Sequence, residues 1–154
     1  MRVRTVAWAL GVVLVMSACA DAQYASPRGE VTFPDGTRVV VEIADTPDLT
    51  ARGLMYRREM GWNEGMVFVF DRVDIIPFWM KNTLIPLDII WLDPDRRIVH
   101  IAHSVPPCKA DPCPSYPPSR AAKYVVEVNS GFAKKHGVKE GDTLVFKNVP
   151  AEPR

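Results

Sequence analysis

The chain is organised around a stretch that reads, from residue 77 to residue 88, Pro77-Phe78-Trp79-Met80-Lys81-Asn82-Thr83-Leu84-Ile85-Pro86-Leu87-Asp88. Two aromatic residues and a methionine run directly into a cation, an amide and a hydroxyl. A second proline then leads into an apolar run, 87–92, that contains a single acid. Polar groups that leave water need hydrogen-bonding partners, so a purely structural strand has no need of this triplet. We therefore expect strands over 78–81 and 87–92, and a binding or turn-forming role for the residues between them.

On both sides of this stretch, short runs of β-branched and aromatic residues alternate with clusters of Gly, Pro, Asn and Asp. This is the pattern of strands and turns. Asp35-Gly36, between two such runs, predicts a hairpin. The expected strands cover 31–33, 38–43, 66–70, 78–81, 87–92, 98–103, 123–128 and 143–146.

Two short helices are expected between the strands. Thr46 is a hydroxyl cap followed by proline, and Gly53 limits that helix to two turns at most. Ser130 is expected to cap a second helix over 131–136, with Gly137 as its stop. The pattern predicts a mainly β fold: a small single-domain, β-barrel-like structure of seven or eight short strands with two short helices.

The first twenty residues have the features of an export signal. Arg2 and Arg4 precede an apolar run over 6–16, and small residues follow. Met16-Ser17-Ala18-Cys19 resembles the bacterial lipobox, in which the cysteine is lipid-modified; cleavage after Ala20 or Ala22 is the alternative. We expect a signal peptide over 1–20, a tether over 21–30, a β-rich domain over 31–147 and a tail over 148–154, with the protein held by its lipid at a membrane face in the periplasm or outer cell envelope.

Charge excludes one class of partner. The chain has 19 basic and 18 acidic residues, and removing Arg2 and Arg4 with the signal leaves 17 against 18. A domain with nearly equal numbers of basic and acidic side chains lacks the excess positive charge expected of a nucleic-acid-binding protein.

Three blocks of sequence carry a family resemblance. They are Arg52-Gly53-Leu54-Met55, then Gly65-Met66-Val67-Phe68-Val69-Phe70, then Phe78-Trp79-Met80-Lys81-Asn82-Thr83 with Pro86-Leu87-Asp88. With Val125-Val126-Glu127-Val128, Gly131 and Gly141-Asp142, the chain resembles the bacterial and archaeal Domain of Unknown Function 192 family from about Thr32 to Phe146. The resemblance implies a compact, β-barrel-like single domain that is often exported, and it implies no particular chemistry.

Five neighbouring residues are the first candidates for a ligand site. Lys81, Asn82 and Thr83 offer hydrogen-bond donors, Trp79 a flat apolar wall and Met80 an adaptable contact. The alternative is that Asn82 and Thr83 complete a turn while Trp79 and Met80 fill the core.

Two charged residues, Arg52 and Asp88, complete the candidate set, and Glu127 is not part of it. An unpaired Asp88 would be costly in an apolar strand, so it is expected to pair with Arg52 or Lys81 for structure or to join a site with them. Arg52 matches a carboxylate on a ligand, or ties its short helix to the sheet. Glu127, in the middle of a predicted strand, is expected to face solvent.

The histidines do not predict a metal site. Strict alternation in the run 98–103 places Ile98, His100 and Ala102 on one face and Val99, Ile101 and His103 on the other. The two histidines therefore cannot share one metal. His136 is expected to be a favourable cation at a helix end. We expect no metal and no cofactor.

The loop after this run holds six prolines between 106 and 118, with Cys108 and Cys113 enclosing four residues. This spacing fits neither a two-residue redox pair nor common zinc knuckles. Outside the cytoplasm a structural disulfide is the natural state of such a pair.

Three functions remain open from the sequence. The first is an exported, lipid-anchored module that binds a small polar ligand or cell-envelope component. The second is a hydrolase of an envelope or carbohydrate substrate, with Asp88 as general acid/base. The third is an interaction or assembly factor that uses the proline-rich disulfide loop. The sequence does not predict an oligomeric state.

Overall fold

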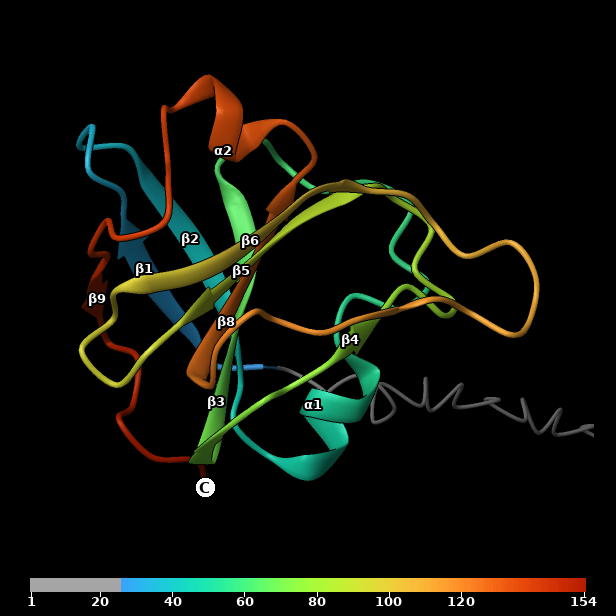
Figure 1. The fold of residues 1–154 in the computed structure, drawn as a ribbon, viewed down its shortest axis with the longest axis horizontal. Coiled ribbons are helices and arrows are strands. Elements are labelled where there is room, and N and C mark those ends of the chain that lie inside the picture. Colours follow the sequence, from blue (N-terminus) through green and yellow to red (C-terminus); the bar gives the residue numbers. More distant parts are fainter. Residues whose placement is uncertain (1–25) are drawn as a thin grey trace, which may run out of the picture.

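The computed structural model describes residues 26–154, which form a mainly β domain (Figure 1). The predicted signal peptide, with Cys19, and the first half of the predicted tether lie outside this range. In chain order the elements are β1 (Arg28–Thr32), β2 (Arg38–Ala44), α1 (Pro47–Arg52), β3 (Glu64–Asp74), β4 (Phe78–Trp79), β5 (Leu87–Leu92), β6 (Ile98–Val105), β7 (Ser115–Tyr116), β8 (Ala122–Asn129), α2 (Phe132–Lys135) and β9 (Val145–Lys147).

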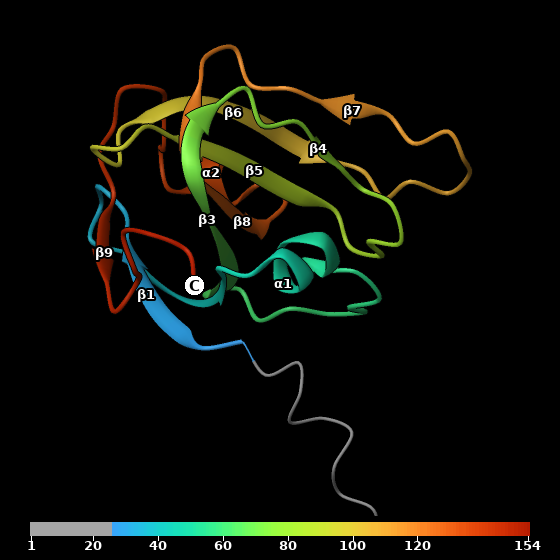
Figure 2. The same ribbon diagram turned by 90° about the horizontal axis from the view of Figure 1, so that it is seen from below.

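Seven of the strands form one curved sheet in the order β6-β5-β8-β3-β2-β1-β9, and β4 pairs with β7 in a separate ribbon (Figure 2). The expected β-rich domain with two short helices is confirmed. The sheet is not closed into a barrel along its edges. An isolated bridge between Arg97 and Thr143 joins the start of β6 to the segment before β9.

The hairpin and the first helix follow their local sequence signals. β1 and β2 are antiparallel neighbours, and Gly36 adopts the left-handed φ of 85° that the turn requires. The Thr46 side chain accepts the N–H of Leu49, with Pro47 in the first turn. β2 and β3 are parallel, so the chain must cross over between them, and α1 lies in that crossover. β1 begins at Arg28, inside the predicted tether.

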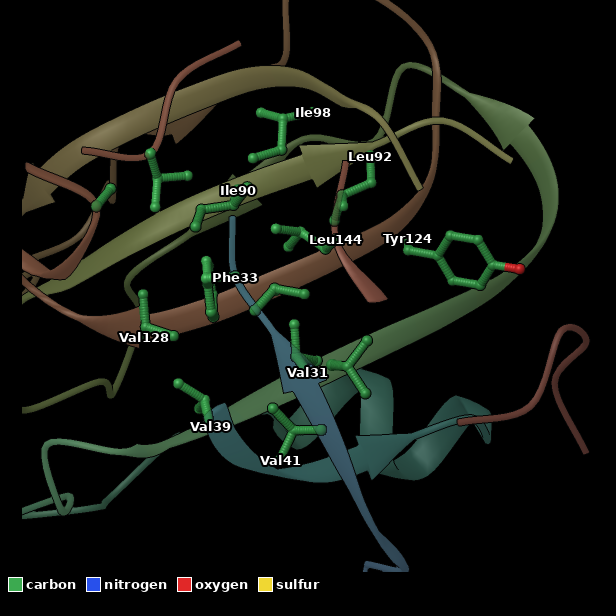
Figure 3. Close-up of a cluster of buried hydrophobic side chains, with 14 of the residues drawn as sticks. Val31, Phe33, Val39, Val41, Ile90, Leu92, Ile98, Tyr124, Val128 and Leu144 are labelled. Atoms are coloured by element: carbon green, nitrogen blue, oxygen red, sulfur yellow. The ribbon is translucent and has the colours of Figure 1, made fainter. Parts of the chain in front are cut away.

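Two apolar clusters lie on opposite faces of the central strands. The first, shown in Figure 3, contains Ile90 and Leu92 of β5 with Val126 and Val128 of β8. The second contains the alternate residues of the same strands, such as Trp91 and Val125. Every residue of β5 is buried, as is every residue of β8 except the last. These two strands are therefore covered on both faces, which fixes the environment of any polar side chain they carry.

β6 departs from the alternation expected for 98–103. Leu92 of β5 lies opposite Ile98, but the preceding Trp91 lies opposite His100, so β6 contains an extra residue at this point. As a result Ile98 belongs to the first cluster and Ala102 to the second. The prediction that these two share a face was wrong, because a β-bulge reverses the alternation.

The segment predicted as a C-terminal tail packs against the domain. The guanidinium of Arg154 donates to both oxygens of Asp45, at 2.7 and 2.9 Å. Lys123 of β8 is paired with Glu152 at 2.8 Å. These contacts place residues 152–154 beside the end of β2 and the start of β8.

Candidate ligand-binding cavity

A cavity of about 120 Å³ lies between α1, β3, β4 and β8. Both α1 and β4 stand at the end of the sheet away from β9 (Figures 1 and 2). The lining includes Phe68, Phe70 and Phe78, and Glu127 contributes to it from β8. A single ordered water needs only roughly 10–15 Å³ by the same measure, so the space suits a small molecule.

Glu127 is the central polar group of this cavity. It lies in the sheet between Met66 of β3 and Ile89 of β5 and is only 4% exposed. Within residues 26–154 no hydrogen bond or ion pair reaches its carboxyl, and burial raises its pKa to about 8. The prediction that Glu127 faces solvent was wrong, because the second apolar cluster and the elements around the cavity cover that face of β8.

The aromatic wall is built around Phe78. Its ring meets Phe68 edge to face, with ring centroids 4.9 Å apart, and lies 5.8 Å from Trp91. The indole N–H of Trp91 donates to the carbonyl of Ile76 at 2.8 Å, which fixes the segment that leads into β4. Aromatic rings held in such pairs keep a defined wall beside the carboxyl.

Gly53 allows α1 to end directly over this wall. Its φ is 47°, and a Cβ at this position would approach the ring of Phe68 to 3.3 Å. The cap N–H of Gly53 bonds the carbonyl of Leu49. The positive φ favours glycine at this position, and a side chain there would also crowd the ring of Phe68.

Three of the predicted site residues line the cavity: Arg52, Trp79 and Thr83. Trp79 is 52% exposed and does not fill the core. The Thr83 side chain is buried, and its hydroxyl is 3.5 Å from the carbonyl of Lys81. They come from α1, from β4 and from the segment between β4 and β5.

Three other predicted site residues do not line the cavity: Met80, Lys81 and Asn82. Met80 is buried in the second apolar cluster. Lys81 pairs with Asp111 of the disulfide loop at 3.2 Å. Asn82 has a left-handed φ of 56°, and its carbonyl accepts the N–H of Tyr56. The turn-forming interpretation therefore fits Asn82, since asparagine tolerates this conformation.

Asp88 has a structural position away from the cavity. Its carboxylate accepts three backbone N–H groups: Ser104 at 2.7 Å, Gly131 at 3.1 Å and Ala133 at 2.8 Å. Asp88 is fully buried, so backbone donors take the place of the expected pairing with Arg52 or Lys81. Asp88, and not Ser130, caps the N-terminus of α2, whose own N-cap residue supplies no side-chain bond.

The predicted disulfide is confirmed. Cys108 and Cys113 are bonded, with Cα atoms 5.7 Å apart. The loop lies on the outer side of the cavity wall, because Phe78 of β4 pairs with Tyr116 of β7 and the Cys108 N–H donates to the carbonyl of Met80. The disulfide therefore shapes a loop that supports β4.

The histidines lie apart. His136 contacts Asp35 at 2.8 Å, and His100 lies against the ring of Trp91. Across the described part of the chain, no group of three or more His, Cys, Asp or Glu side chains is placed to hold a metal ion.

A family model and two curated relatives agree on one family. The family model described as "Uncharacterized ACR", Domain of Unknown Function 192, matches residues 30–146. A UPF0127 protein of Thermococcus kodakarensis is 33% identical over 119 residues, covering 74% of this chain and 68% of the relative. A UPF0127 protein of Thermococcus gammatolerans is 33% identical over 124 residues, covering 73% and 74%.

A solved structure has a similar fold and sequence. The crystal structure of a protein of unknown function from Novosphingobium aromaticivorans is 38% identical, with a TM-score of 0.68, and covers 78% of this chain and 84% of that one. The resemblance drawn from the sequence is therefore confirmed, and the chain belongs to the Domain of Unknown Function 192 family.

Proposed function

We propose that this protein is an exported, lipid-anchored binding module that holds a small polar ligand or cell-envelope component in the cavity beside Glu127. One observation carries the proposal. Glu127, a residue only 4% exposed, has no polar partner for its carboxyl within residues 26–154 and lines an aromatic-walled cavity. Burial of such a group is costly unless something pairs with it, and perturbed acids in cavities are typical of functional sites. A ligand is the partner that this site lacks.

The export part of the proposal rests on two features. The lipobox-like segment ends at Cys19, and the domain carries a disulfide, which is typical of proteins in oxidising compartments. Over residues 26–154, no helix has the length and apolarity to cross a membrane. Mass spectrometry of the mature N-terminus tests this part: a diacylated or triacylated Cys19 is expected, and an unmodified chain starting after Ala20 or Ala22 would overturn it.

Asp88 is poorly placed to act as the general acid/base of a hydrolase. The Asp88 carboxylate is occupied by three backbone donors and does not line the cavity. The interaction hypothesis keeps its loop, but that loop has a structural task beside β4. The binding module is therefore the function that the side chains support best.

A fragment screen by two-dimensional amide NMR tests the proposed site. Fragments that bind should shift the amides of Gly53, Phe78 and Glu127. The variant Ala51→Trp, at the exposed mouth of the cavity, should abolish these shifts. Its matched control, Ala121→Trp, adds the same ring at an exposed position that does not line the cavity. Fragments that bind elsewhere, or equally well to both variants, would contradict the proposal.

A further inference from the structure

We infer that the ligand of this cavity carries a protonated amine, which pairs with the Glu127 carboxylate while its carbon skeleton packs on the aromatic wall. This inference rests on the proposed function, because it names the chemical class that the same cavity binds. Three properties of the cavity support this inference: the charged residues of its lining, its aromatic rings and the ionisation of Glu127.

The charges around the cavity favour a cation at its inner end. Glu127 is the only acid among the residues that line the described cavity, and it approaches from β8. The strands on either side of it present apolar side chains, Met66 and Ile89. The other charged group of the lining is Arg52, which α1 presents at its exposed C-terminal end. Glu127 is therefore the charged group of the lining that can pair with a cationic ligand.

The wall favours the same class of ligand. Phe68, Phe70 and Phe78 line the same cavity as Glu127. A cation within about 6 Å of a ring centroid is attracted by the negative face of the π-system, and alkyl groups attached to it gain apolar contact. Carboxylates that stand among aromatic rings are a general solution for recognising amines.

The state of Glu127 explains why a charged ligand is preferred to a neutral one. Taking a carboxylate out of water is the main obstacle to a buried ion pair, and here folding has already desolvated it. A hydrogen bond between ionised partners is roughly twice as strong as a neutral one. A neutral alcohol or amide would meet the protonated acid and gain only the weaker bond.

This mechanism has a defined pH dependence. Burial holds the pKa of Glu127 at about 8 in the empty cavity, so near pH 7 about a tenth of the molecules carry the carboxylate. A primary ammonium stays protonated to about pH 10. Because only the ionised form binds it, the apparent affinity should rise about tenfold from pH 7 to pH 9. Below pH 8, binding should also release a proton from the protein.

The experiment uses n-propylammonium as the cationic probe and 1-propanol and propionamide as neutral probes of similar size. Amide NMR titrations at pH 6, 7, 8 and 9 give the affinities, and the side-chain carboxyl ¹³C resonance of Glu127 follows its titration. Propylammonium should bind with the tenfold rise and should lower the pKa of Glu127, and the neutral probes should bind more weakly and without that rise. Glu127→Gln should lose propylammonium binding at least tenfold and keep neutral binding within about twofold. The exposed Glu59→Gln should behave as the parent protein.

The outcomes separate this inference from the proposed function. Neutral probes that bind as well as propylammonium, or that bind better as pH falls, would overturn the amine while leaving a ligand-binding cavity. Propylammonium binding that survives Glu127→Gln in a folded variant would overturn the role of the carboxylate. If no probe shifts the cavity amides at any pH, both the inference and the proposed site fail.

Discussion

The carboxylate of Asp88, in β5, accepts the backbone N–H of Ala133, in α2, at 2.8 Å across 45 positions of sequence. The same side chain bonds Gly131 and Ser104, so one acid joins a central strand, the start of a helix and the end of β6. The first N–H groups of a helix have no partners within it. Asp88 supplies those partners from the sheet, which ties α2 to the domain.

We expect Asp88→Ala to lower the free energy of unfolding by about 3–5 kcal/mol, since three backbone donors lose a charged acceptor. Asp88→Asn keeps one acceptor oxygen and should lose about half as much. Urea unfolding followed by circular dichroism measures both. The exposed Asp95→Ala is the control and should change stability by less than about 0.5 kcal/mol. A loss of ligand binding in Asp88→Asn without loss of stability would return this residue to the functional site.

Local signals in the sequence were sufficient for much of the fold. Asp35-Gly36 specifies a hairpin, and Thr46-Pro47 specifies the start of α1, because each depends on neighbours along the chain. The apolar runs at 66–70 and 87–92 are too continuous for a half-exposed sheet and lie in central strands. Cys108 and Cys113 pair as expected from their spacing and from the predicted export.

What sequence reasoning missed depends on contacts between distant segments. Ser130 precedes α2 in the sequence, where a capping residue is expected. The cap is instead Asp88 of β5, whose carboxylate accepts the backbone N–H of Ala133. β6 contains no glycine, so the sequence carries no signal for its bulge. Glu127 interrupts an apolar run just as Asp88 does, and that interruption was the available signal. Alternation alone cannot say which elements cover the face on which Glu127 lies.

Replacing both Cys108 and Cys113 by serine should lower the free energy of unfolding by about 2 kcal/mol, because the bond closes only a short loop. The loop supports β4, so the amides of Phe78 and Trp79 should also exchange faster with solvent. Thermal unfolding and hydrogen exchange check the two effects. If the amides of β4 exchange as slowly in the variant as in the parent protein, the ribbon of β4 and β7 does not depend on the disulfide.

Arg154→Ala should lower the free energy of unfolding, because it leaves the Asp45 carboxylate, 2% exposed, without its ion pair. A double-mutant cycle with Asp45→Asn measures the coupling directly. The double variant should be more stable than Arg154→Ala alone, since it removes the uncompensated charge. Arg120→Ala, at an exposed position, is the matched control. Additive effects in the cycle would contradict the proposed contact.

The last prediction concerns the stability of Glu127→Gln as a function of pH. Burial raises the folded-state pKa of Glu127 to about 8 from an ordinary value of 4.5. Between these two values the folded protein keeps a proton that the unfolded chain has lost, so the contribution of this group to stability is complete below pH 4.5 and is lost as pH rises to 8. Glutamine has nearly the same shape and never ionises.

Glu127→Gln should therefore match the parent protein near pH 4 and exceed it by a few kcal/mol above pH 8, a gain that grows with pH in between. Chemical unfolding at pH 4, 6, 8 and 9 measures the difference, with Glu59→Gln as the control that should show no such trend. A constant difference at every pH would mean that the acid is not held in an apolar setting. A gain confined to high pH, together with loss of propylammonium binding, would separate the two effects of one carboxyl: its ionised form destabilises the empty domain and binds the ligand in the occupied one.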